Sequence, residues 1–172
     1  LKAQLKRDDA GPHTLEDAFY ISLWLALSQL VTPRGLRRMS RQTLRYAVRS
    51  GRVNNATSLK QWRTNREMIQ IRREIERDWS NQVRLLANTG EFSRMLNWSN
   101  DYLVPIDNSE LIIATHRFDE NGAKESLFTV VITELLVNAI SYYNTESNVP
   151  VSLAWHEDDD FVSLICRNPT TD

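Results

Sequence analysis

The chain has 172 residues, of which 41% are hydrophobic and 25% are charged, and its formal net charge is −1. These values are typical of a soluble globular protein with one ordinary domain or two small ones. No apolar run has membrane-spanning length and no signal peptide is visible, which excludes a membrane segment in this sequence. A single cysteine, Cys166, excludes a disulfide framework and favours a reducing, cytoplasmic compartment.

The small net charge conceals a strong asymmetry along the chain. Residues 33–84 contain 14 Lys and Arg against 4 Asp and Glu, a net charge of +10. Residues 85–172 contain 4 against 14, a net charge of −10. The two halves therefore attract each other, or each of them attracts an outside partner.

The first ordered element predicted is a helix that begins after a polar linker or frayed terminus, residues 1–13. Thr14 followed by an acidic residue three positions later is a helix-start signal. Apolar residues then cover more than one helical face, so we expect a largely buried helix that reaches about residue 31. Thr32 and Pro33 end it.

A second helix is predicted over residues 33–50, ending at Gly51. Its arginines recur every three or four residues and therefore form one stripe: Arg34, Arg38, Arg41, Arg45, Arg49 and Arg52. The stripe is a solvated face, a face that docks on the acidic half, a contact for nucleic-acid phosphates, or a site for an acidic protein partner. Residues 40–52 also faintly resemble the recognition helix of a helix-turn-helix.

A long third helix is predicted over residues 58–87, because Ser58 begins a capping-box pattern and an apolar seam runs from Met68 to Leu86. Its length would be about 45 Å at 1.5 Å per residue. Such a helix packs on the first helices as a bundle or pairs with a second subunit, and we expect a homodimer through this region. Residues 91–98 are expected to add a short helical turn. Residues 102–105 and 111–115 are then expected to form short strands.

Residues 127–143 have the pattern of a helix with one buried face. That face is expected to contain Leu127, Val131, Leu135 or Leu136, and Ile140. Glu134 and Asn138 lie four residues apart and thus on one side of the helix, among apolar neighbours. A buried carboxylate and carboxamide need partners, and Mg²⁺ with a nucleotide phosphate would supply them. The alternative is a core helix with two satisfied polar side chains.

The segment Glu134-Leu-x-x-Asn138-Ala, with Tyr142 one turn later, resembles the N-box of the histidine-kinase-like ATPase superfamily. This superfamily includes sensor histidine kinases, Hsp90 chaperones, MutL and type II topoisomerases. The resemblance implies ATP and Mg²⁺ as cofactors, with Asn138 binding the metal and Tyr142 contributing to the nucleotide site. It also implies that Glu134 acts as a general base or orients one.

The residues after the N-box extend the resemblance, which covers about residues 101–172. Alternation over residues 150–155 and 161–166, with a polar turn between them, predicts a β-hairpin. In the superfamily a hairpin is followed by an Asp-x-Gly-x-Gly box, whose Asp accepts the adenine amino group. Asn168 stands at that position here, and the glycines are missing, so we expect the sequence to be a fragment of the family fold.

The predicted fold class is therefore α+β. A basic helical bundle over residues 14–99, similar to a dimerisation domain, precedes part of a histidine-kinase-like α/β sandwich over residues 100–172. Sensor histidine kinases have this order, but Ser28 occupies the place of their phosphoacceptor histidine, and His13, His116 and His156 stand at positions expected on the surface. The expected function is an ATP-binding signalling kinase or ATPase. The alternative is an inactive pseudo-kinase or regulatory module that dimerises and binds an acidic protein or nucleic acid through its arginines.

Overall fold

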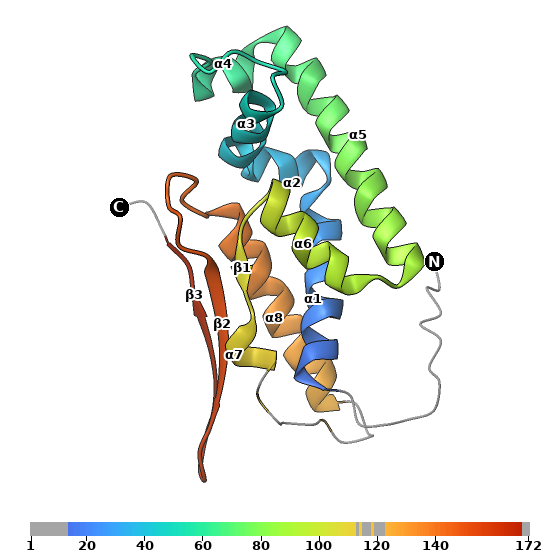
Figure 1. Ribbon diagram of the computed structural model, residues 1–172, viewed down its shortest axis with the longest axis vertical. Helices are drawn as coiled ribbons and strands as arrows, with labels where there is room; N and C mark the ends of the chain where they lie inside the picture. Colours follow the sequence, from blue (N-terminus) through green and yellow to red (C-terminus); the bar gives the residue numbers. More distant parts are fainter. Residues whose placement is uncertain (1–13, 113, 115–117, 119–122, 170–172) are drawn as a thin grey trace.

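The computed structural model describes residues 14–112, 114, 118 and 123–169 (Figure 1). These residues form a mostly helical α+β fold with one three-stranded sheet, as predicted at the level of class. The helices are α1 (Leu15–Leu30), α2 (Pro33–Arg38), α3 (Ser40–Arg49), α4 (Leu59–Thr64), α5 (Arg66–Thr89), α6 (Phe92–Tyr102), α7 (Ser109–Ile112) and α8 (Ala123–Ser141). The strands are β1 (Ile106–Asp107), β2 (Val151–Glu157) and β3 (Val162–Arg167). The linker predicted over residues 1–13 and two of the histidines, His13 and His116, lie outside the described residues.

Helices α1 and α8 lie side by side at the centre of the molecule (Figure 1). The predicted start of α1 is confirmed, because the Thr14 hydroxyl accepts a hydrogen bond from the Asp17 backbone N–H at 3.2 Å. Halfway along α1, the Ser22 hydroxyl donates to the backbone carbonyls of Ala18 and Thr129, at 2.7 and 3.1 Å. This second bond ties α1 directly to α8.

Two predicted helices are each broken in two. Met39 leaves the helical conformation between α2 and α3, with φ −88° and ψ 31°, and its side chain is fully buried. The chain changes direction at this point while Leu36 and Met39 both stay buried in the core. Asn65 separates α4 from α5, because its side chain accepts from the backbone N–H groups of Glu67 and Met68 and so begins a new helix. The predictions of one helix over 33–50 and one over 58–87 are wrong in this respect.

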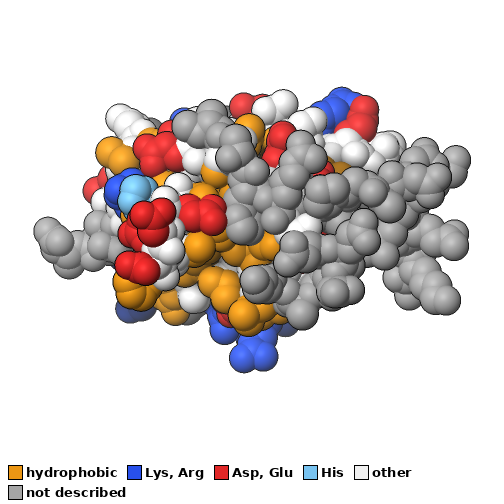
Figure 2. Space-filling model, turned by 90° about the horizontal axis from the view of Figure 1, so that it is seen from below, with side chains coloured by type: hydrophobic (Ala, Val, Ile, Leu, Met, Phe, Trp, Pro, Cys, Tyr) orange, Lys and Arg blue, Asp and Glu red, His pale blue; other side chains and the backbone are white. Residues whose placement is uncertain are grey.

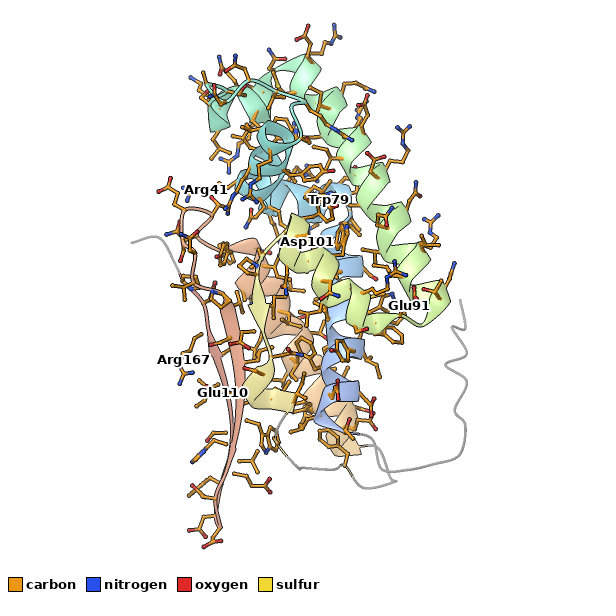
Figure 3. All side chains as sticks on the ribbon, in the orientation of Figure 1. Arg41, Trp79, Glu91, Asp101, Glu110 and Arg167 are labelled. Atoms are coloured by element: carbon orange, nitrogen blue, oxygen red, sulfur yellow. The ribbon has the colours of Figure 1, made fainter. Side chains whose placement is uncertain are left out.

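The apolar seam of α5 is buried inside the chain. Trp79 is 2% exposed and lies between α5 and α6 (Figure 3). Its ring meets Tyr46 and Trp98 edge-on, with centroids 5.3 and 6.0 Å apart. The bundle arrangement of the helices thus covers this seam with the chain's own side chains, and the same core continues through α1 to α8.

The predicted hairpin is confirmed, and it forms a sheet of order β1-β2-β3. β1 pairs with β2 in parallel, and β2 pairs with β3 antiparallel, with Leu153 opposite Cys166. The first hairpin strand is longer than predicted, so that His156 lies in β2 rather than in the turn. Asp158 forms the turn by accepting from the backbone N–H groups of Asp160 and Phe161, at 3.0 and 2.7 Å.

The two strands predicted over residues 102–105 and 111–115 are wrong. Tyr102 ends α6, and the following residues cap that helix, since the backbone N–H groups of Leu103 and Val104 both bond to the Ser99 carbonyl. The end of α6 therefore satisfies the backbone N–H groups of Leu103 and Val104, which we had expected to bond to a neighbouring strand. Residues 109–112 are helical, residues 113 and 115 lie outside the described part, and β1 is only two residues long.

The sheet covers one side of α8 and α1 covers another, with α5 and α6 beyond α1 (Figure 1). The Phe128 ring of α8 meets the Trp155 ring of β2 edge-on, with centroids 5.2 Å apart. None of the helices in the described ranges is both long and apolar enough to cross a lipid bilayer.

Candidate functional site

The buried face of α8 differs from the predicted one. Leu127 and Val131 are 66% and 42% exposed, and the buried residues are instead Phe128, Ile132, Leu136, Val137, Ala139 and Ile140. The apolar residues of this helix are spread around most of its circumference, so its pattern could not fix which side faces the core. The sheet and α1 cover two sides of the helix and leave one strip open to solvent. We call this strip the α8 stripe; it contains Leu127, Val130, Val131, Glu134, Asn138 and Tyr142.

Glu134 and Asn138 do lie together, one helical turn apart on the α8 stripe. Both side chains are exposed, and neither forms a hydrogen bond or ion pair with another described residue. The expectation that they are buried among apolar neighbours is therefore wrong. Tyr142 continues the stripe and is 68% exposed. The three polar groups are therefore accessible to a ligand rather than engaged in the core.

A pocket of about 380 Å³ adjoins the stripe at Glu134. We call it the α2 pocket; its walls come from the end of α1, from α2 and from α8, and its residues are Gln29, Leu30, Thr32, Arg34, Gly35, Arg38, Glu134 and Val137. It brings one carboxylate from the acidic half to the same cavity as two guanidinium groups from the basic half. Its volume lies within the range of small-molecule sites.

Gly35 allows α2 to approach close enough to form this pocket. A Cβ atom at Gly35 would lie 2.6 Å from the backbone C and Cα atoms of Leu30, and closer still to its carbonyl oxygen. The Thr32 hydroxyl fixes the same turn by donating to the Gln29 carbonyl and accepting from the Gly35 N–H, at 2.9 and 3.2 Å. The sequence shows Thr32 and Pro33 only as a helix end, so these pocket residues were not predicted.

Asn168 lies just beyond β3, beside the loop that follows α8. The backbone N–H of Asn144 donates to the Pro169 carbonyl at 2.9 Å, which joins these two segments. The side-chain oxygen of Asn168 is buried and has no hydrogen-bond partner. A buried carbonyl oxygen without a donor is costly, and an amino group would satisfy it.

A second, larger hollow of about 810 Å³ lies between α3 and the loop after α8. We call it the basic groove; Arg41, Leu44, Arg45, Val48, Arg49, Asn55, Thr57, Leu59, Asn144, Thr145 and Glu146 line it. Gln42 holds α3 against α8, because its side-chain amide donates to the Ile140 carbonyl at 2.7 Å. Gln42 is 3% exposed, and nothing in its sequence context marked it as the link between the two helices.

The six arginines predicted as one stripe are divided into three groups. Arg34 and Arg38 line the α2 pocket, and the three arginines of α3 line the basic groove. Arg52 lies apart from both groups and pairs with Asp78 of α5 at 2.9 Å, and this hydrogen bond raises the pKa of Arg52. The break at Met39 accounts for the first division.

Within the described ranges, no ion pair joins the basic segment (residues 33–84) to the acidic segment (residues 85–172). The Arg52–Asp78 pair lies inside the basic segment, and the Arg94–Glu91 pair lies inside the acidic one. The five arginines of the α2 pocket and the basic groove therefore form no ion pair with any residue in the described ranges.

No protein-family model matches the chain, and no curated protein or solved structure matches it either. Over the described residues, no group of three or more His, Cys, Asp and Glu side chains is placed to hold a metal ion on its own. A Mg²⁺ ion that arrives with a nucleotide needs fewer protein ligands, commonly one or two oxygens. Glu134 and Asn138 offer such oxygens on the α8 stripe.

Proposed function

We propose that the chain binds Mg²⁺–ATP along the α8 stripe and acts as a histidine-kinase-like signalling protein, either a kinase or an ATPase. One observation carries the proposal. Glu134 and Asn138 stand one turn apart on an exposed helix face, without partners among the described residues, and Glu134 shares a pocket with Arg34 and Arg38. The sequence resemblance at the N-box supports the same assignment.

The donor set suits a nucleotide with its metal. The Asn138 carbonyl oxygen and the Glu134 carboxylate are the hard oxygen ligands that Mg²⁺ prefers. The guanidinium groups of Arg34 and Arg38 are suited to phosphate oxygens, which they can bind in bidentate fashion. Bound Mg²⁺ would neutralise negative charge on the phosphates.

Two further residues fit the adenosine part. The buried, unpartnered side-chain oxygen of Asn168 would accept a hydrogen bond from the adenine amino group. Tyr142 offers an exposed aromatic ring on the same stripe as Asn138. Asn168 carries no charge, so it binds the amino group less strongly than the aspartate of the superfamily would.

The chemical role that we propose belongs to Glu134. Its exposed carboxylate can take a proton from an attacking water or hydroxyl group, which makes the chain a candidate phosphotransferase or ATPase. Ser28 stands where sensor kinases carry their phosphoacceptor histidine, so we propose no histidine acceptor in α1.

Replacing Asn138 with Ala tests the proposal. We expect the Mg²⁺-dependent affinity for labelled ATP to fall at least tenfold while the thermal unfolding temperature stays unchanged, because the Asn138 side chain makes no contact that the fold needs. Asn97→Ala is the matched control, since Asn97 is an exposed helical asparagine on α6. Equal ATP affinity in the parent and in Asn138→Ala would remove Asn138 from the site.

Replacing Glu134 with Gln separates binding from chemistry. We expect ATP to stay bound while its turnover falls by about 10² to 10⁴, the usual loss for a general base. Glu110→Gln, at an exposed glutamate of α7, is the control. If Glu134→Gln turns over ATP at the parental rate, Glu134 is not the base.

A second candidate function is a non-catalytic regulator that acts by binding a partner. The observation in its favour is the basic groove, whose three arginines form no ion pair within the described part of the chain. Absence of any ATP binding in the parent protein, at millimolar ATP and Mg²⁺, would favour this candidate over the first.

A further inference from the structure

The basic groove combines charge with an apolar floor. Arg41, Arg45 and Arg49 supply three positive charges from one face of α3. Leu44, Val48 and Leu59, each half-buried, lie between them. One acidic residue, Glu146, lies on the opposite wall. The groove therefore fits an acidic segment that also presents an apolar side chain.

The lining of the groove disfavours a nucleic acid as its occupant. Proteins that hold single-stranded nucleic acid stack bases on aromatic side chains. None of the residues that line the groove is aromatic. Backbone phosphates alone would leave the apolar floor uncovered.

The chain itself carries a segment with the required chemistry, at the turn of its hairpin. We call this segment the acidic tip; it consists of Asp158, Asp159, Asp160 and Phe161. All four side chains are exposed, and Phe161, at 72%, is the most exposed of the large hydrophobic residues in the described part. Figure 2 shows acidic side chains gathered around His156, the one described histidine, at this end of the molecule.

The acidic tip cannot reach the basic groove of its own molecule. The hairpin turn projects from one end of the structure, and α3 and α4 lie at the other (Figure 1). Arg41 marks the groove end in Figure 3, beside the loop that follows α8.

We propose that the acidic tip of one copy docks in the basic groove of a second copy, so that the protein self-associates head to tail. The three aspartates face the three arginines, and Phe161 covers the apolar floor. Because the two surfaces differ, each added copy leaves one groove and one tip free. Association therefore continues beyond the dimer as concentration rises. This proposal is independent of nucleotide binding, since neither surface includes the α8 stripe.

Sedimentation of the full chain at increasing concentration tests the proposal. In low salt we expect the weight-average mass to rise steadily without a plateau at the dimer. Charged contacts on exposed surfaces weaken as the screening length falls from about 10 Å at 0.1 M to about 3 Å at 1 M salt. We expect the association constant to fall by on the order of tenfold over that range.

Two variants, each with one damaged surface, make the test specific. Arg41→Gln with Arg49→Gln removes charge from the groove, and Asp159→Asn with Asp160→Asn removes charge from the tip, so that the two damaged surfaces do not attract each other. Asp158 is left intact because its carboxylate forms the turn. Each variant alone should be monomeric. Mixed together, they should form a one-to-one dimer and nothing larger, because only one groove and one tip remain functional.

Two single substitutions serve as controls: one should leave association unchanged and the other should strengthen it. Arg52→Gln should leave association unchanged, because Arg52 pairs with Asp78 outside the groove. Glu146→Gln should strengthen association by removing the one acidic side chain that lines the groove.

Several results would overturn the proposal. A parent protein that stays monomeric at low salt would do so. The same follows if the groove variant associates like the parent, or if the mixture of the two variants stays monomeric. Binding of a fluorescein-labelled single-stranded DNA 20-mer that is lost in the groove variant, in a protein that does not self-associate, would assign the groove to nucleic acid instead.

Discussion

Replacing Gly35 with Ala tests how the α2 pocket is built. In an unobstructed helix this change is favourable by about 0.8–1.0 kcal/mol, because glycine loses more backbone entropy on folding than alanine. Here the new methyl group would lie 2.6 Å from two backbone atoms of Leu30. Backbone atoms cannot move aside as a flexible side chain can, so α2 must shift away from the end of α1.

The cost of such overpacking is typically about 1–3 kcal/mol and is sometimes larger. The new methyl group is fixed directly to the α2 backbone and would meet the backbone of Leu30. We therefore place the cost of this clash at or above the upper end of that range. After subtracting the helix-propensity gain, we expect a net loss of about 2 kcal/mol or more in the free energy of unfolding. For a chain of this size the thermal midpoint would then fall by roughly 4–8 °C.

Urea unfolding followed by tryptophan fluorescence gives the required free energies. Gly90→Ala is the informative control, because a Cβ there meets nothing within 4 Å but the residue has φ +69°. It should cost about 1–2 kcal/mol through backbone strain alone. Gly35→Ala should also weaken ATP binding, since it displaces Arg34 and Arg38. A Gly35→Ala protein as stable as the parent, or more stable, would refute the close approach of α2 to α1.

Three further predictions concern residues outside the α2 pocket. Thr43→Val should destabilise the fold by about 1–3 kcal/mol in urea unfolding, because it leaves the buried Trp62 indole N–H without its 3.0 Å bond to the Thr43 hydroxyl, whereas Thr43→Ser should retain most of the stability. Burial raises the pKa of the Cys166 thiol, so iodoacetamide at pH 8 should alkylate the folded protein more slowly than the urea-unfolded chain; equal rates would contradict this. Asn168→Asp should lower the thermal midpoint near neutral pH by placing a carboxylate at a buried, unpartnered position, and less so at a pH low enough to protonate it. With Mg²⁺–ATP present, Asn168→Asp should recover thermal stability. It should also bind Mg²⁺–ATP more tightly than the parent protein does, whereas Asn97→Asp should show neither gain.

Local signals in the sequence predicted the parts of the fold that depend on neighbouring residues. Thr14 and Ser58 both form the capping boxes that their spacing indicates. Helix α5 ends at Thr89, close to the end predicted at residue 87, and Gly90 follows it in the left-handed conformation, with φ 69°. The hairpin follows from alternation on either side of an acidic turn. In each of these cases the decisive hydrogen bonds join residues a few positions apart.

The predictions that failed depend on contacts between distant residues. The α8 helix is apolar around most of its circumference, so the buried face is chosen by α1 and by the sheet, through contacts such as Ser22 with Thr129 and Phe128 with Trp155. Met39 is an ordinary helix former in a helical pattern, so nothing local indicates the turn there, and the bond from Gln42 to the Ile140 carbonyl of α8 is a long-range contact that holds α3 in its new direction.

The candidate site was predicted in part for the same reasons. The spacing of Glu134 and Asn138 was enough to place them on one helix face, and the structure confirms that they lie together there. It was not enough to tell whether that face is buried. The α2 pocket depends on the contact between Gly35 and the end of α1, for which a glycine among arginines is no signal.

The break at Met39 connects the two proposals physically. A single helix over residues 33–50 would present all its arginines along one rod, suited to one extended anionic partner. The break turns Arg34 and Arg38 toward Glu134, where the charges suit a compact phosphate group. It leaves the α3 arginines around a separate groove with an apolar floor. Because Gln42 fixes α3 to the end of α8, both sites are built on the same helix, yet they share no arginine and can be removed independently.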